Sequence, residues 1–194
     1  MSTFDDLRAI ALTEFANTGY AGTSLHRVAE LAGVSKSNVL YHFASKEALL
    51  EAAIGPAIER MGVILGSVAT QPLTTESRDA FVVAFVDFLL EHRQEVHMFI
   101  NQGRSLEDVP VINRANELVV QLASYFSSAA VSTEDTMRFG IALGGAAYML
   151  VSQAAFQISP PPIDETRAAL ITIVRELLAP ITVLPARRVA TAQE

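Results

Sequence analysis

The sequence predicts an all-α protein, and three observations lead to that prediction. Apolar residues recur at every third or fourth position through most of the chain, as on the buried face of a helix. No segment alternates apolar and polar residues as a half-buried strand would, and no repeat interrupts the pattern. With 194 residues, 51% of them hydrophobic, the chain can bury one large core, or a small domain joined to a larger one. We expect about nine helices.

Two helices are expected before residue 34. The first begins at Phe4 and ends near Gly19, which can take the left-handed conformation that follows many helices. Either Thr23 or Ser24 is in position to cap the second, because both side chains can accept a hydrogen bond from the free amides of a first turn. Gly33 ends this second helix. Both helices are therefore bounded by local signals.

The later helices follow from the same spacing. Ser35 is expected to cap a third, very short helix that ends at Phe43, and Ser45 to cap a fourth. Pro56 has no amide proton for the carbonyl of Ala52, so it should kink or divide the fourth helix. Further helices are expected at residues 78–93, 94–104, 109–128, 133–157 and 164–178, with a linker at 70–77 and a disordered tail at 185–194.

Composition excludes several classes of protein. The formal charge of −7 argues against an unselective nucleic-acid coat, because such binding depends on many cations. There is no cysteine, which excludes disulfides and thiolate metal sites. The N-terminus is acidic where a secretory signal carries positive charge, and the apolar windows are shorter than the roughly 20 residues that span a bilayer. We expect a cytoplasmic protein.

Positive charge is scarce but concentrated. The chain contains two lysines, Lys36 and Lys46, and both lie beside the short third helix. Residues 23–46 contain these two and Arg27 against one acid, Glu30, which gives a local balance of +2. This segment is the part of the chain best suited to an anionic partner.

Residues 23–43 match the helix-turn-helix layout, in which a second short helix enters the major groove of DNA. Lysine can donate to guanine, asparagine can bond adenine, and a hydroxyl can hold a phosphate. The alternative is that these side chains only solvate an exposed helix. We favour DNA recognition, because so short a helix does not persist alone. The inward residues are Val28, Ala29, Val34, Val39 and Phe43, and the outward residues are Lys36, Ser37, Asn38, Tyr41 and His42.

The stretch "GY…TSL…VAELAGVSKSNVLYHFASKEALL", from Gly19 to Leu50, resembles the N-terminal signature of the TetR family of bacterial transcriptional regulators. The resemblance covers about the first fifty residues, and its motifs occur in order at the family's intervals. It implies a homodimer that binds a palindromic DNA operator through the third helix. It also implies an N-terminal three-helix helix-turn-helix DNA-binding domain, followed by a larger helical domain for a small-molecule inducer and for dimerisation.

The resemblance assigns roles to individual residues. It implies that the third helix reads the bases, with His26 as a further candidate, and that Lys46 and the start of the second helix contact phosphate. The sequence departs from the family pattern in two ways. Asp5 and Asp6 stand where many members have basic residues, and the usual aromatic position is Leu40, with the ring at Tyr41. The predicted DNA contacts are Thr23, Ser24, His26, Lys36, Ser37, Asn38, Tyr41, His42 and Lys46.

The C-terminal part contains material for an apolar ligand site. Phe81, Phe85 and Phe88 form a stripe along one helix, and aromatic, methionine and a few polar side chains follow on later helices. A mainly apolar pocket with few polar anchors is how small-ligand sites are built. The alternative is that these residues only form the core, and the pocket itself is implied mostly by the resemblance. The predicted ligand contacts are Phe81, Phe85, Phe88, Met98, Phe99, Gln102, Tyr125 and Tyr148.

The last two long helices are candidates for a dimer interface. The helix over 133–157 is apolar on two faces and rich in glycine and alanine, which permits close helix approach. Two helices from each subunit would then form a four-helix interface. The alternative is a helix crossing within one chain. The predicted interface residues are Met137, Ile141, Gly144, Tyr148, Val151, Leu170, Val174 and Leu177.

No catalytic or metal signature is recognisable. His92 and His97 are five residues apart, whereas metal-binding helices prefer pairs at i and i+4. We expect no cofactor and no enzymatic activity. The predicted domains are residues 1–46, which bind DNA, and 47–184, which bind the ligand and dimerise, before the tail at 185–194. The predicted function is a dimeric repressor that a small, largely apolar inducer releases from its operator. The alternatives are an all-α binding protein or enzyme with an incidental helix-turn-helix, or a corepressor-dependent repressor or activator.

Overall fold

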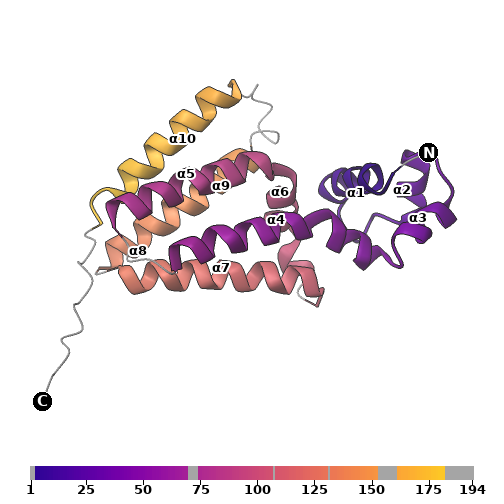
Figure 1. The fold of residues 1–194 in the computed structure, drawn as a ribbon, viewed down its shortest axis with the longest axis horizontal. Helices are drawn as coiled ribbons and strands as arrows, with labels where there is room; N and C mark the ends of the chain where they lie inside the picture. The colour runs from indigo at the N-terminus through magenta and orange to yellow at the C-terminus, as the bar shows by residue number, and fades with distance from the viewer. Residues whose placement is uncertain (1–2, 70–73, 107, 131, 153–160, 182–194) are drawn as a thin grey trace, which may run out of the picture.

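A computed structural model describes residues 3–69, 74–106, 108–130, 132–152 and 161–181. Within these ranges every regular element is helical, so the predicted all-α class is confirmed. Figure 1 shows a small group of helices, α1 to α3, at one end of a larger bundle, with α4 running from one into the other. The elements are α1 (Phe4–Thr18), α2 (Leu25–Leu31), α3 (Lys36–His42), α4 (Lys46–Ala69), α5 (Thr75–Glu91), α6 (Arg93–Gln102), η1 (Gly103–Leu106), α7 (Pro110–Ala129), α8 (Thr133–Phe139), η2 (Gly140–Gly144), α9 (Gly145–Ser152) and α10 (Ile163–Leu178).

The acidic start of the chain forms a helix cap. The Thr3 hydroxyl accepts a hydrogen bond from the Asp6 amide at 3.3 Å, and the Asp6 carboxylate accepts one from the Thr3 amide at 2.9 Å. These hydrogen bonds lower the pKa of Asp6. Asp5 lies in the same first turn, where negative charge is favourable to the helix dipole. The two acids that depart from the family pattern therefore stabilise the beginning of α1.

Two expected boundaries are wrong. α4 runs without a break from Lys46 to Ala69 with Pro56 inside it, so Pro56 does not divide the helix. Pro56 is exposed, so water can reach this side of α4 and hydrogen-bond to the carbonyl that lacks an amide donor. α5 begins at Thr75, inside the expected linker, because Thr74 and Ser77 form a capping box there. The tail at 185–194 lies outside the described residues.

The helix expected over 133–157 contains a wider turn. α8 and α9 are joined without a gap by the π-helical segment η2, and residues 153–157 lie outside the described ranges. A π turn contains more residues than an α turn, so it rotates the faces that follow it. If α8, η2 and α9 are counted as one helix, the described residues contain nine α-helices, the number expected.

The buried side chains form two clusters. One joins α1, α2 and α3 to the first turns of α4, and it also includes Met98 from α6 and Val111 and Ile112 from α7. The other lies between α4, α5, α7, α8, η2, α9 and α10. The first cluster extends past residue 46, so the predicted domain boundary crosses a shared core rather than a linker. Because both clusters include residues of α4 and α6, a movement of either helix would change the packing of both clusters.

An ion pair ties α10 to α5. Two nitrogens of the Arg167 guanidinium donate to the Asp87 carboxylate, Nε to Oδ1 at 2.5 Å and Nη2 to Oδ2 at 2.9 Å. These hydrogen bonds hold the pKa of Asp87 below its ordinary value of 3.8. A carboxyl with a depressed folded pKa stabilises the fold above its unfolded pKa, and that contribution disappears as the pH falls through the folded value.

We therefore expect Asp87→Asn to lower the free energy of unfolding at pH 7 by no more than about 1 kcal/mol, because the pair is partly exposed. The difference from the wild type should shrink as the pH falls below 3.8 and through the lower folded pKa of Asp87, because the carboxyl then becomes protonated in the folded as well as the unfolded state. Urea titrations at pH 7 and through the acid range test this. Asp79→Asn is the matched control, since Asp79 meets Arg175 between the same helices at a looser 3.5 Å. A difference that persists unchanged in acid would contradict the assignment.

Candidate nucleic-acid interface and apolar cavity

Local capping shapes the helix-turn-helix segment. The Ser24 hydroxyl accepts from the Arg27 amide and the Ser35 hydroxyl accepts from the Asn38 amide, so Ser24 and Ser35 are the caps of α2 and α3. Between the helices Gly33 has a φ of +67°, a conformation that other residues rarely adopt. The turn closes with a hydrogen bond from the Val34 amide to the Ala29 carbonyl at 2.9 Å. The sequence therefore determines this turn locally.

Thr23 is not on the surface. Its side chain is 2% exposed, and its hydroxyl donates to the Gly19 carbonyl at 2.8 Å. It therefore secures the loop between α1 and α2, and a phosphate contact by this side chain does not fit the structure. The alternative that the sequence left open, Thr23 or Ser24 as the cap of α2, is resolved in favour of Ser24.

The outer face of α3 lies as the spacing predicts. Val39 is fully buried and Phe43 nearly so, while Lys36, Ser37 and Tyr41 are exposed, Tyr41 at 84%. Among the described residues Lys36 has no ion-pair partner. Asn38 is half-buried, and its side-chain oxygen is buried with no hydrogen-bond partner in the structure. Asn38 would have to turn outward before it could contact a base.

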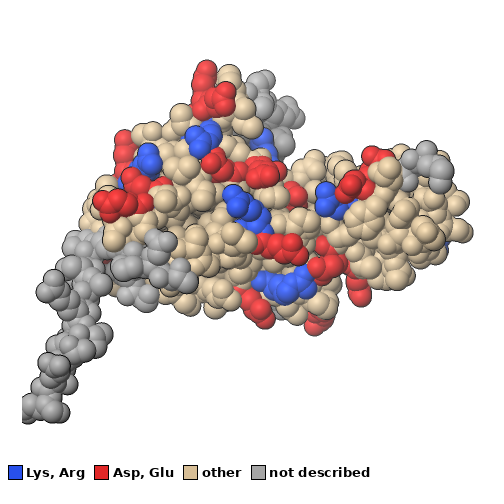
Figure 2. Space-filling view, viewed as in Figure 1, with Lys and Arg blue, Asp and Glu red and all other residues tan. Residues whose placement is uncertain are grey.

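The neighbouring basic residues are already engaged. His26 lies 3.2 Å from Glu30, and Arg27 lies 3.6 Å from both Glu14 and Glu30. The His42 ring, half-buried, lies edge-on to Phe4 and Tyr41. On the face in Figure 2, charged side chains of both signs gather over the larger bundle, and the end with α1 to α3 is mostly uncharged. Exposed, unpaired positive charge on the helix-turn-helix is therefore concentrated at Lys36.

The Lys46 side chain lies over an aromatic ring. It is the first residue of α4, after Ser45, whose hydroxyl accepts from the Ala48 amide. Its ammonium lies 4.2 Å from the centre of the Tyr20 ring, a cation–π contact. Burial lowers the pKa of Lys46 and raises that of the Tyr20 phenol, to which Glu47 also contributes. Tyr20 therefore positions the lysine that was assigned to phosphate.

Gln102 joins the end of α6 to the loop after α1. Its amide nitrogen donates to the Phe15 carbonyl at 2.7 Å, and its amide oxygen accepts from the Tyr20 amide at 2.6 Å. The loop also contains Gly19, whose φ is +87° and where an added Cβ would lie 3.5 Å from the Gln102 oxygen. Gln102 thus holds both sides of this loop, a role that sequence reasoning missed. These two hydrogen bonds join residues that are 82 and 87 positions apart, so no local sequence signal predicts them.

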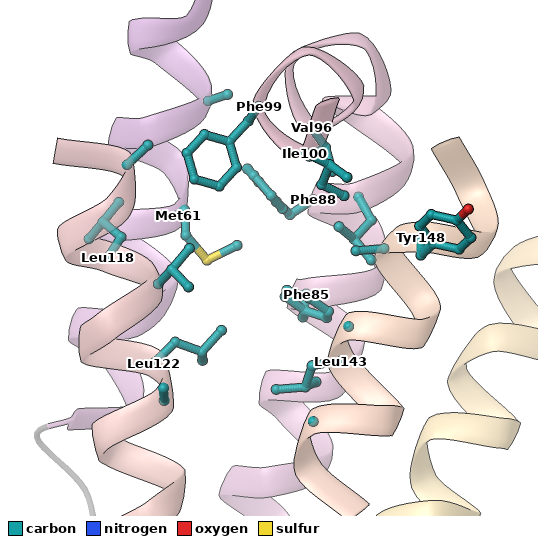
Figure 3. Close-up of a pocket in the computed structure, with 18 of the residues that line it drawn as sticks. Met61, Phe85, Phe88, Val96, Phe99, Ile100, Leu118, Leu122, Leu143 and Tyr148 are labelled. Carbon is teal, nitrogen blue, oxygen red and sulfur yellow. The ribbon is translucent and has the colours of Figure 1, made fainter. Parts of the chain in front are cut away.

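The larger bundle encloses an apolar cavity of about 630 Å³. Figure 3 shows Met61 of α4, Leu118 and Leu122 of α7, Phe85 and Phe88 of α5, Val96, Phe99 and Ile100 of α6, and Leu143 and Tyr148 around it. Its volume lies within the range of roughly 300–1,000 Å³ that is usual for small-molecule sites. Its polar lining residues are Glu95, Ser127, Thr136 and Tyr148.

Half of the predicted ligand contacts line this cavity. Phe85, Phe88, Phe99 and Tyr148 do so. The other four, Phe81, Met98, Gln102 and Tyr125, do not, because tertiary packing turns them elsewhere. Phe81 stacks on Phe85 and meets Phe126 edge-on in the core, and Tyr125 packs on Phe126. Met98 is fully buried in the N-terminal cluster, and Gln102 binds the α1 loop. Sequence reasoning missed Glu95 and Met61, whose helical spacing gave no sign of a cavity.

Among the described residues, apolar side chains of α8, η2, α9 and α10 form an exposed face. Met137 and Ile141 are 59% and 61% exposed, and Met149, Ile163 and Ile173 are also exposed. A groove of about 470 Å³ runs between α9 and α10. Two of the predicted interface residues do not belong to this face. Val151 and Val174 are buried within the chain, and Val174 belongs to the hydrophobic core of the larger bundle.

The remaining predicted interface residues are more accessible. Gly144 and Tyr148 are exposed, and Leu170 and Leu177 are half-buried. Across the ranges that the structure describes, no helix is long and apolar enough to cross a membrane. In the same ranges, no three histidine, aspartate or glutamate side chains gather as a metal site requires.

Comparison with known proteins finds a family match for the N-terminal segment. Residues 7–53 match the model of the bacterial regulatory proteins of the tetR family. A segment of 44 residues is 57% identical to the HTH-type transcriptional regulator RutR of Escherichia coli, over 23% of this chain and 21% of RutR. A longer segment of 111 residues is 30% identical to the HTH-type transcriptional repressor KstR2 of Mycolicibacterium smegmatis, over 55% of this chain and 52% of that protein. The chain therefore matches about a fifth of RutR and about half of KstR2.

The fold of this chain resembles that of solved structures. The ketosteroid transcriptional regulator KstR2 of Mycobacterium tuberculosis superimposes with a TM-score of 0.68 at 15% identity, over 92% of this chain and 94% of that one. At this identity the likeness establishes the architecture alone, and it extends beyond the helix-turn-helix into the larger bundle. The helix-turn-helix segment, residues 7–53, therefore matches the tetR family of bacterial regulatory proteins, and the fold of the chain resembles that of a solved transcriptional regulator.

Proposed function

We propose that the protein is a sequence-specific, DNA-binding transcriptional repressor. The observation that carries this proposal is the α2–turn–α3 unit, which buries Val28 and Val39 and presents Lys36, Ser37 and Tyr41 outward within the segment that matches the family. An exposed, short helix with these side chains suits the major groove. The relatives named above are transcriptional regulators, and we propose the same, non-enzymatic role in the cytoplasm.

The protein would act as a homodimer. The uncovered apolar face of Met137, Ile141, Met149, Ile163 and Ile173 supports this, because contiguous exposed apolar side chains mark interaction surfaces. A second copy would cover it with the same face, as two-fold symmetry requires. A dimer would place two α3 helices on a palindromic operator. In this proposal residues 1–46 bind DNA, and the bundle that follows dimerises and binds the effector.

A small apolar effector would occupy the cavity and reduce operator affinity. α6 supplies Val96, Phe99 and Ile100 to the cavity, and Gln102 at its end holds the loop that contains Tyr20. Tyr20 in turn supports Lys46. A ligand that displaces α6 would therefore alter the surface that meets phosphate. Such coupling requires only that the ligand binds the two conformations with different affinities.

DNA binding is tested with duplexes from the region flanking the protein's own gene. We expect binding that weakens with salt, and Lys36→Ala should lower the affinity by roughly tenfold or more, as the loss of a base or phosphate contact does. Fluorescence anisotropy over a salt series measures both effects. Arg175→Ala, on α10 at the far end of the bundle, removes the same charge and should leave affinity unchanged. Equal losses from the two variants, or binding without salt dependence, would reject the proposal.

A further inference from the structure

We infer that the cavity takes a cationic apolar ligand, one with an amine or quaternary ammonium group on a hydrophobic body. This inference rests on the proposed function, since it names the chemical class of the effector. It is carried by the charge and the aromatic character of the lining. Among the described residues that line the cavity there is one acid, Glu95, and no lysine, arginine or histidine.

Glu95 is placed to meet a cation. It lies in the first turn of α6, and its side chain is 17% exposed. Its Oε1 lies 3.3 Å from Nδ1 of His92, which orients the carboxylate, and Oε2 has no hydrogen bond to a described residue. A carboxylate with an unfilled oxygen in apolar surroundings favours a positive charge beside it, because little water is available to screen the pair.

The aromatic lining favours the same charge. Phe85, Phe88, Phe99, Phe126, Phe139 and Tyr148 all line the cavity. The faces of aromatic rings attract cations, and quaternary ammonium groups are recognised by sites of this kind. Phe99 follows Glu95 by four residues on α6, so both lie on one face of that helix. The carboxylate and the nearest ring can therefore contact one cationic group together.

An anionic ligand is disfavoured by the same lining. A carboxylate inside the cavity would lose its hydration, would meet Glu95 and ring faces of like polarity, and would find no basic side chain among the described lining residues. Ser127 lies in the last turn of α7 and Thr136 on α8, and α8 lies at the other end of the bundle from α6 (Figure 1). They can hydrogen-bond a neutral polar group, so the ligand's charge belongs at the α6 end.

The test uses three probes that share a decyl chain and end in trimethylammonium, hydroxyl or carboxylate. Calorimetry with the full-length protein should give the tightest binding for the ammonium probe and at least about tenfold weaker binding for the carboxylate probe. Glu95→Gln should weaken the ammonium probe by about tenfold and leave the alcohol unchanged. Glu91→Gln is the matched control, because Glu91 is exposed at the end of α5 and does not line the cavity.

Other results would overturn the inference. It fails if the carboxylate probe binds best, if the three probes bind equally, if none binds, or if Glu91→Gln has the effect expected of Glu95→Gln. Operator binding without ligand is measured on the same preparations. If operator binding is intact while the probe order is wrong, only the ligand class is rejected. If the protein does not bind operator DNA at all, it is the proposed function that fails.

Discussion

Replacing Gln102 by leucine is expected to lower the free energy of unfolding by about 1–3 kcal/mol and to weaken operator binding. The substitution removes two hydrogen bonds, and it leaves the part-buried Tyr20 amide without its acceptor, which costs about 1–3 kcal/mol. The Phe15 carbonyl keeps its hydrogen bond from the Gly19 amide at 3.1 Å. The loop after α1 would loosen, and Tyr20 would no longer hold Lys46 in place. Urea unfolding and operator titrations measure the two effects.

The segments in which hydrogen exchange rises distinguish a local loss of coupling between Gln102 and the Tyr20 loop from general destabilisation of the fold. Hydrogen exchange should rise in residues 15–24 and remain unchanged in α5, because local opening exposes only the segment that Gln102 holds. Asn101→Ala is the control, since Asn101 donates only to the His97 carbonyl of its own helix and is exposed. That variant should stay within about 0.5 kcal/mol of the wild type. Faster exchange everywhere, or operator binding equal to that of Asn101→Ala, would rule out a coupling role for Gln102.

The second large effect is expected at Arg78, where replacement by alanine should lower the free energy of unfolding by about 3 kcal/mol. Arg78 is 7% exposed, and its Nη1 donates to the Leu178 carbonyl at 2.9 Å and the Ile181 carbonyl at 3.3 Å. Leu178 is the last residue of α10 and Ile181 follows three residues later, where carbonyls lack partners within the helix. The Leu178 carbonyl also accepts from the Ile181 amide at 3.1 Å. Hydrogen bonds from a charged donor contribute about 1.5–3 kcal/mol, and the truncation also leaves a cavity.

Thermal and urea unfolding of Arg78→Ala measure this contribution. Arg175→Ala serves as the control, since Arg175 lies on α10, is well exposed and meets Asp79 only at 3.5 Å. Its effect should be below about 1 kcal/mol. Similar losses in the two variants would mean that Arg78 contributes no more than an exposed ion pair. Because α10 is part of the proposed dimer surface, Arg78→Ala should also raise the concentration at which the dimer dissociates.

The helix-turn-helix was predictable because its determinants are local. Ser24, Ser35 and Ser45 each cap a helix through a hydrogen bond to an amide three residues later, and Gly33 supplies the turn. Such signals act within one turn of chain, so sequence alone contains them. Of the predicted DNA contacts, only Thr23 is withdrawn from the surface, and the others remain predictions that the operator experiments address.

The cavity and the uncovered face were only partly predictable. Spacing identified Phe85, Phe88, Phe99 and Tyr148 as apolar, but a buried aromatic can line a cavity or fill a core, and spacing does not distinguish the two. Val151 was assigned to the outer face by counting α-helical turns, but it is buried, whereas Tyr148, three residues earlier on the same helix and assigned to the same face, is exposed. The spacing within a helix does not show where the faces of the packed bundle begin and end.

The sequence by itself determined the helical class, the caps, the turn at Gly33 and the family resemblance of the N-terminal segment, because each depends on residues close together in the chain. Tertiary structure alone decided that Gln102 holds the Tyr20 loop, that Arg78 caps α10 and that Glu95 is the acid in an aromatic cavity. The first two contacts join residues 82 to 103 positions apart. Which residues form such pairs depends on how whole helices pack against each other, because that packing sets both the direction and the distance between their side chains. The periodicity within a single helix contains no information about this packing.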